Sequence, residues 1–258
     1  MKLSNKLLLG LCAFLCLTVI SGMGFASMNM VITKVSAPER SAPHLETKIL
    51  AASYTSTSLA LDGAHVSNYT LDPNQSSIIA KGEAKVLEQL IINEGGILTF
   101  SQVAEGNLRA SNIPVAITIG IKDKENLSIH LSHDAQLNTV DILRNDMMLM
   151  LEDNAEAILH TEADTLMVIM SDDTKLNLVG KSDRLFVNVE DEVKIVGEGF
   201  YTDKLEVNME NRSLVKLGKA RNITGDMEDK AVLHFEQPCV GSKVKRQDKA
   251  IITYGSGD

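Results

Sequence analysis

The chain has 258 residues, 44% of them hydrophobic and 23% charged, with a formal net charge of −9. This composition is typical of a globular protein with one large domain or two small ones. Because aromatic residues make up only 4% and tryptophan is absent, a surface that stacks sugars or bases is hard to assemble. The acidic charge excludes nucleic acid and anionic lipid surfaces as favoured partners.

Residues 1–26 have the pattern of an export signal. Lys2 and Lys6 precede the apolar stretch LLLGLCAFLCLTVISG, and GFA before Ser27 resembles a small-residue cleavage site. Uncleaved, residues 7–26 are long enough to span a bilayer as an anchor, and they are the only predicted membrane contact. Cleavage removes two lysines and no acid, which changes the net charge from −9 to −11. It also leaves Cys239 as the single cysteine, so no internal disulfide is expected.

Residues 27–58 carry two prolines and the run SYTSTS without a sustained period, which predicts a flexible spacer. From Leu59 onward, short alternating runs such as HVSNYTL and GILTF are separated by Asp-Gly, Asp-Pro-Asn and Gly-Gly. This pattern predicts strands of about five residues joined by turns. The stretch AKVLEQLII is compatible with a helix or a strand. The folded domain is predicted to extend over residues 59–258.

Residues 126–236 repeat. The apolar residue before each acidic turn serves as a marker, and the markers are Leu131, Leu151, Met170, Val189, Met209 and Met227, separated by 20, 19, 19, 20 and 18 residues. Further apolar columns lie four places before each marker (Leu127, Met147, Leu166, Leu185, Leu205, Ile223) and six places after it (Leu137, Ala157, Leu176, Ile195, Val215, Leu233).

A period near 20 residues with two alternating segments per repeat predicts an all-β fold, a parallel β-helix (solenoid) with coils of about 18–20 residues. Successive coils would stack about 4.8 Å apart and place like side chains over one another. The bias of parallel connections favours the right-handed form. Because an open end exposes unpaired backbone, residues 237–258 are predicted to be a C-terminal cap.

Two stretches carry a family resemblance. The opening LDGAHVSNYTLDPNQSSIIAKGEAKVLEQLIINEGGILTF and the coils represented by LMVIMSDDTKLNLVGKSDRLFVNV resemble the secreted bacterial proteins described as "putative auto-transporter adhesin, head GIN domain". The resemblance covers about Leu59 to Tyr254. It implies a right-handed β-helix and export to the periplasm, the cell surface or the exterior of a Gram-negative bacterium, and it supplies no catalytic motif. One departure is Gly197, which stands where neighbouring coils keep an apolar residue.

The strongest candidate site is a column two places after the markers. Its members are His133, Asp153, Asp172, Asp191, Asn211 and Asp229. Stacked like charges destabilise strands unless they are neutralised, and calcium bound by the four aspartates would do so. Nearby lysines and an arginine could neutralise the charges equally well. Asp and Asn also favour turns through hydrogen bonds to their own backbone. The glycine-rich nonapeptide of repeat calcium sites is missing from the sequence. Turn formation is therefore the favoured interpretation: no cofactor is expected, and calcium is the alternative.

Three other candidates favour structural roles. In HLSHD, His130 is expected to face outward on a strand and His133 to lie in the turn, so the two need not converge on a metal. Met170, Met209 and Met227 share a column with Leu131 and Leu151, which predicts core filler rather than copper ligands. Cys239 lies in a polar segment with no nearby histidine and is a weak candidate nucleophile.

Two classes of function fit this pattern. The favoured hypothesis is a non-catalytic cell-envelope protein that acts as an adhesin or surface-binding module for a cell-surface glycan or an envelope protein. The alternative is a polysaccharide lyase or glycoside hydrolase on a β-helix. A lyase for an anionic polymer needs a basic groove, and a hydrolase needs two carboxylates beneath a cleft, whereas this chain is acidic and its turns are short. Both requirements favour the first hypothesis.

Overall fold

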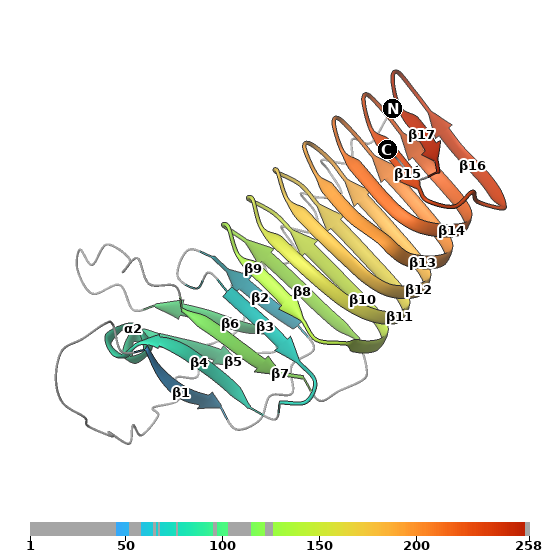
Figure 1. The fold of residues 1–258 in the computed structure, drawn as a ribbon. Coiled ribbons are helices and arrows are strands. Elements are labelled where there is room, and N and C mark those ends of the chain that lie inside the picture. The colour runs from blue at the N-terminus through green and yellow to red at the C-terminus, as the bar shows by residue number, and fades with distance from the viewer. Residues whose placement is uncertain are drawn as a thin grey trace.

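The computed structural model describes residues 45–51, 58–63, 66, 68–75, 77–94, 97–102, 115–121 and 126–255. Most of the described residues lie in strands, with one short helix among them, and the coils stack into a β-solenoid of about seven turns (Figure 1). This confirms the predicted β-helical fold. The predicted export segment, residues 1–26, lies outside the described residues. Among the residues that are described, no helix is both long and apolar enough to cross a membrane.

The regular part of the solenoid contains eight strands, which pair in parallel from coil to coil. They are β8 (Leu127–Ser132), β9 (Gln136–Thr139), β10 (Ile142–Leu151), β11 (Glu156–Met170), β12 (Lys175–Val189), β13 (Lys194–Met209), β14 (Leu214–Met227) and β15 (Val232–Phe235). The long strands β11 to β14 each run along one side of the solenoid, bend, and continue along the other side.

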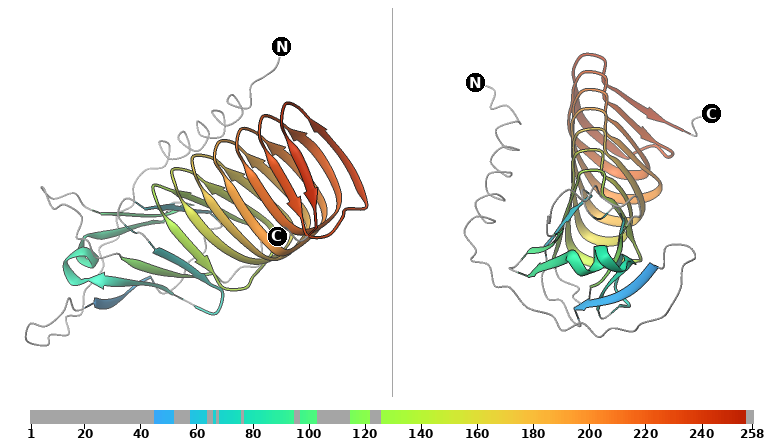
Figure 2. Two further views of the ribbon diagram at one scale, coloured as in Figure 1. Left: turned by 45° about the horizontal axis from the view of Figure 1, so that its top comes forward. Right: turned by 90° about the vertical axis from the view of Figure 1, so that its left-hand side faces the viewer.

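Each coil therefore has two flanks and two edges. Flank 1 contains the marker segments, such as 166–170 and 185–189, and flank 2 contains the segments that follow them, such as 175–179 and 194–197. The turn edge is the short turn after each marker, and the bend edge is the opposite side, where the long strands change direction. Figure 2 shows the coils stacked along a single axis.

The observed register confirms all three predicted apolar columns. Leu151 pairs with Leu131 and with Met170, and the marker column continues through Val189 and Met209 to Met227. The columns four places before and six places after the markers are paired in the same way. Parallel pairing of equal positions is what stacking of like side chains requires.

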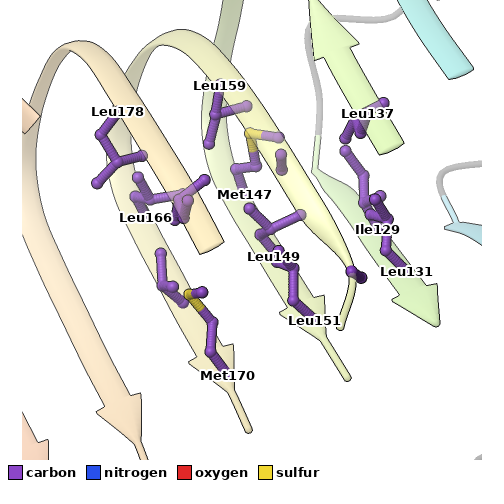
Figure 3. Close-up of a cluster of buried hydrophobic side chains, with 14 of the residues drawn as sticks. Ile129, Leu131, Leu137, Met147, Leu149, Leu151, Leu159, Leu166, Met170 and Leu178 are labelled. Carbon is purple, nitrogen blue, oxygen red and sulfur yellow. The ribbon is translucent and has the colours of Figure 1, made fainter. Parts of the chain in front are cut away.

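The core is the narrow space between the two flanks. Close-up views show Leu149 and Leu151 of flank 1 beside the corresponding residues of adjacent coils, with Leu159 and Leu178 supplied by flank 2 (Figure 3). Leu149, Leu151 and Leu159 are fully buried. Because every coil contributes only a few such side chains, burial becomes effective only when several coils are stacked.

The N-terminal part is less regular than the sequence suggests. Its elements are β1 (Leu45–Ala51), β2 (Ser58–Asp62), β3 (Asn68–Asp72), β4 (Ile78–Glu83), α2 (Ala84–Gln89), β5 (Leu90–Glu94), β6 (Ile97–Gln102) and β7 (Ala116–Gly120). The coil formed by β2 and β3 is inserted between two later ones, because β2 pairs with both β6 and β8, and β3 with both β7 and β9. Coil order in space thus differs from coil order in sequence.

Strand β1 corrects the predicted spacer. It pairs antiparallel with β4, and Leu50 is buried in the core. The prediction of a flexible segment over residues 27–58 is therefore wrong for residues 45–51, which are held by backbone pairing with β4, by burial of Leu50 and by a hydrogen bond from Lys48 Nζ to the Leu87 carbonyl. The remaining spacer residues, apart from Ser58, lie outside the described part. The stretch AKVLEQLII, which is compatible with a helix or a strand, contains both: helix α2 ends at Gln89 and strand β5 follows it.

The segment predicted as a C-terminal cap is built as one further coil. Strand β16 (Gly241–Arg246) stacks on β14, and β17 (Ile251–Tyr254) stacks on β15. Ser242 and Arg246 occupy the positions that Ile223 and Met227 fill one coil earlier. Polar residues at inner positions suit a coil whose far side has no further strand among the described residues.

Candidate binding surfaces of the solenoid

The predicted column of acidic residues lies on the turn edge. Each member has a positive φ, from 53° at His133 to 66° at Asp191, and Asp248 extends the column with a φ of 55°. This left-handed conformation disfavours most side chains, and Asp and Asn tolerate it best after glycine. The backbone therefore accounts for the residue types that recur in this column.

The two members that are not acidic each lie between acids. His133 places Nδ1 3.5 Å from Asp62 Oδ1 and Nε2 3.7 Å from Asp153 Oδ2. Asn211 donates from Nδ2 to Asp191 Oδ1 at 3.1 Å and from its backbone N–H to Asp229 Oδ2 at 3.4 Å. These contacts relieve like-charge repulsion between neighbouring coils.

The four candidate calcium ligands have protein partners. Asp153 faces His133, Asp172 accepts a hydrogen bond from Ser171 Oγ at 2.8 Å, and Asp191 and Asp229 accept from Asn211. Within the described residues, no three side chains of His, Cys, Asp or Glu are grouped so that they could hold a metal ion. Calcium binding by this column stays a prediction.

The two histidines of HLSHD lie near one shared carboxylate, which the spacing within HLSHD does not predict. Both lie beside Glu152, one coil away, and His130 Nε2 is 3.5 Å from Glu152 Oε2. Contact with the His130 imidazole, aided by the charges of His130 and His133, lowers the pKa of Glu152 against the opposing effect of burial. The cluster is a set of imidazole–carboxylate contacts that links neighbouring coils.

The methionine column and Cys239, the other two candidates from the sequence, lie in the core and on the last coil. Met170, Met209 and Met227 are fully buried in the marker column, in agreement with a core role. Cys239 is half-buried on the last coil, with Sγ 3.2 Å from the hydroxyl of Tyr254. A neutral tyrosine hydroxyl does not lower the pKa of a thiol in the way that a neighbouring cation does, so this contact does not activate Cys239 as a nucleophile.

The outer face of flank 2 carries a polar depression of about 510 Å³. Five successive coils line it. Half of its outward side chains are amides or a hydroxyl, namely Asn68, Thr70, Gln136, Asn138 and Asn177, and the rest are charged or apolar, namely Glu156, Ile158, Lys175, Lys194 and Val196. Glu156 and Lys175 form an ion pair of 2.6 Å within it. Sequence reasoning missed this face, because only the inward positions of each strand repeat a residue type.

The outer face of flank 1 carries an apolar patch, formed by Met148, Met150, Met167, Ile169 and Phe186. Met167 is 39% exposed and the other four are half-buried. A signal exists in the sequence, since MMLML and LMVIM are apolar at outward as well as inward positions. Strands that are apolar on both faces are typical of segments covered on both sides.

Comparisons with solved structures show the same fold at low sequence identity. A "putative adhesin" from Parabacteroides merdae matches with a TM-score of 0.65 and 13% identity, over 83% of this chain and 97% of that one. A "putative adhesin" from Parabacteroides distasonis also has a TM-score of 0.65, with 10% identity over 83% of this chain and 98% of that one. A "putative lipid binding protein" from Parabacteroides distasonis has a TM-score of 0.57 and 13% identity, over 83% and 97% of the two chains.

A comparison with curated proteins gives no match. A family match, in contrast, covers most of the solenoid, from residue 57 to residue 234. It spans the inserted coil of β2 and β3 and the regular coils through β15. The chain belongs to the family described as "putative auto-transporter adhesin, head GIN domain".

Proposed function

We propose that this protein is an exported, non-catalytic binding module of the Gram-negative cell envelope, and that the outer face of flank 2 binds a neutral cell-surface glycan. The observation that carries the proposal is the depression of about 510 Å³, in which four amide side chains and one hydroxyl lie beside two lysines and one glutamate. Membership of an adhesin family and the apolar, lysine-preceded residues 1–26 support export to a surface.

The chemistry of this face suits sugars that carry hydroxyl groups. An amide both donates and accepts hydrogen bonds, as a sugar hydroxyl does, so each can satisfy the other. Asn138 and Asn177 lie in one outward column, separated by the coil that carries Ile158. Because coils repeat at about 4.8 Å, such a column offers regularly spaced contacts to a polymer. Tyr69 points into the core and is buried, so the binding relies on polar contacts.

The same face is poorly suited to hydrolysis. A glycoside hydrolase places two carboxyl groups on either side of the scissile bond. Glu156 is the one acid among the residues that line the depression, and its carboxylate is held by Lys175 at 2.6 Å. This depression therefore lacks the pair of carboxyl groups that a glycoside hydrolase needs.

Glycan retention tests the proposal. The full chain is applied to immobilised neutral envelope and host glycans, with an Asn138→Ala/Asn177→Ala variant and an Asn188→Ala/Asn208→Ala control. The control removes two amides from flank 1, where Asn208 donates to Asn188 at 2.9 Å. Saturable retention by the wild type and the control, lost in the flank 2 variant, is the expected result. Retention that survives in the flank 2 variant, or release of reducing sugar into the eluate, would contradict it.

A further inference from the structure

We propose that the last coil of the solenoid binds an acidic, extended segment of a partner protein, which adds to β16 as a further parallel strand. This coil, residues 241–255, forms the end of the solenoid opposite to β1 and α2 (Figure 1). The inference concerns one end of the molecule rather than the face of flank 2, and it does not depend on the proposed glycan binding.

The last coil is basic, whereas the rest of the chain is acidic. Residues 241–255 contain three lysines and one arginine against a single acid, Asp248, which gives a local charge of +3. Because the whole chain carries −9, all other residues together carry −12. The four cations are Lys243, Lys245, Arg246 and Lys249. A local charge of this sign attracts acidic partners and repels basic ones.

The cations of the last coil lack the partners that cations of earlier coils have. Four earlier cations, Lys175, Lys181, Arg212 and Arg221, each form an ion pair with an acid of the preceding coil. Among the described residues, none of the four cations of the last coil forms such a pair. Lys243 stacks on Thr224 and Arg246 on Met227, and Lys245 stacks on Asp226 without an ion pair. The positive charge of this coil is therefore available to a partner.

The outer edge of β16 carries backbone groups that point away from β14. In parallel pairing, successive residues direct their N–H and C=O groups alternately to the strands on either side. Gln247 donates its N–H to the Met227 carbonyl at 2.9 Å, so the backbone groups of Val244 and Arg246 face the other way. No strand lies on that side within the described part of the chain. Such an edge is a template for an added strand.

The same end leaves the core partly uncovered. Val244 and Ile252 pack against the core but are only half-buried. The ring of Tyr254 stacks on Phe235 with 5.9 Å between centroids and is 45% exposed. Arg246 takes the inward marker position in this coil. An added strand would cover Val244 with an apolar side chain and meet Arg246 with an acid.

Charge selects the occupant of this edge. Lysines on an edge strand discourage pairing, and here they exclude a second copy of β16, because cations would face cations. An acidic strand is attracted instead, since opposite charges stabilise cross-strand pairs. An anionic polysaccharide would meet the same cations but has no peptide backbone to pair with that of Val244. The segment that fits residues 243–246 therefore has the pattern acid, apolar, acid, acid.

Fluorescence anisotropy with a labelled peptide tests the proposal. The probe is fluorescein-labelled Ser-Glu-Val-Glu-Glu-Ser, titrated with the full chain. Saturable binding that weakens with added salt is expected. A Lys243→Glu/Lys245→Glu variant is expected to raise the dissociation constant by about tenfold or more. The matched control, Lys194→Glu/Lys204→Glu, reverses two exposed lysines of β13 and is expected to bind as the wild type does.

Proline distinguishes strand addition from attraction by charge alone. Val244→Pro keeps every charge of the coil and removes an N–H that faces the added strand, at a kind of position where an edge strand tolerates proline. This variant is expected to lose peptide binding while its circular dichroism melt shows that it is folded. Peptide binding that survives in Val244→Pro would overturn the proposal. So would the absence of saturable peptide binding, equal affinity for Ser-Lys-Val-Lys-Lys-Ser, or binding of heparin in place of the peptide, which would assign the cations to an anionic polysaccharide.

Discussion

Gly197 faces Phe200 so closely that a Cβ at Gly197 would lie 3.0 Å from Phe200 Cβ. The same Cβ would lie 3.1 Å from Leu178 Cβ and 3.2 Å from Leu217 Cδ2, the residues of the two adjacent coils. Strand β13 has one more residue at its bend edge than β12, and this irregularity turns Phe200 into the core, where it is fully buried. The glycine that departs from the apolar column is therefore compensated by a ring from the same coil.

The compensation predicts non-additive stability changes. Gly197→Leu overfills the core and is expected to lower the free energy of unfolding by about 1–3 kcal/mol, and Phe200→Ala by about 3–5 kcal/mol. The double variant should lose less than the sum, because the leucine fills part of the space left by the ring. Urea unfolding of the three variants measures these values. Strict additivity would show that the two positions do not share one space.

Asp172 lies on the turn edge with a φ of 57°. We therefore expect this position to tolerate glycine but not alanine. Asp172→Ala is expected to cost about 1–2 kcal/mol of unfolding free energy, because Cβ disfavours the left-handed region. Asp172→Gly and Asp172→Asn should stay within about 0.5 kcal/mol of the wild type, because both residues adopt this conformation readily.

Melting temperatures with calcium and with chelator accompany the Asp172 series. If the Asp and Asn residues of the column are there because they tolerate a positive φ, calcium should leave the melting temperatures of the wild type and the three variants unchanged. A wild-type melting temperature that rises with calcium and loses that rise in Asp172→Asn would assign the column to the ion instead.

The sequence predicts some of these features and not others, for physical reasons. The marker column from Leu131 to Met227 was predictable because a constant spacing reports directly on parallel register. The position of β2 and β3 between later coils was not predictable, because it depends on contacts between segments that lie far apart in the chain. The meeting of His130 and His133 at Glu152 depends on a residue one coil away. The apolar patch was missed because alternation was interpreted only for the inward side.

Tyr69 predicts a response to alkaline pH. Its hydroxyl donates to the Asp62 carbonyl at 2.9 Å, and burial raises its pKa far above the ordinary value of 10. An unfolded tyrosine ionises near pH 10 whereas the folded one does not, so the folded state binds more protons and loses stability as pH rises above 10. Tyr69→Phe should reduce this loss, while costing about 1 kcal/mol at neutral pH for the missing hydrogen bond. Urea unfolding at pH 7.5 and pH 10.5 measures both effects. An unchanged alkaline loss in the phenylalanine variant would contradict the assignment.

Glu152 predicts a response to acid. Contact with the His130 imidazole, whose Nε2 lies 3.5 Å from Oε2 of Glu152, lowers the pKa of this carboxyl group below the ordinary 4.5. A carboxyl group with a lowered folded pKa stabilises the protein fully above its unfolded pKa, and that stabilisation disappears as pH falls through the folded value. Glu152→Gln is therefore expected to be less stable than the wild type at pH 6, by no more than about 1 kcal/mol because the pair is partly exposed. The unfolding free energies of the two proteins should converge as pH falls below 4.5, because the Glu152 carboxylate then becomes protonated.

The matched control for acid unfolding is Glu198→Gln, which removes an exposed carboxylate at the bend edge. Its stability should run parallel to that of the wild type as pH falls, because no contact to a histidine is lost. His130→Gln should resemble Glu152→Gln, because either change separates the same pair, which lies 3.5 Å apart. If His130→Gln leaves the acid response of the wild type intact, the histidine is not what stabilises the Glu152 carboxylate, and the link between these two coils rests on packing alone.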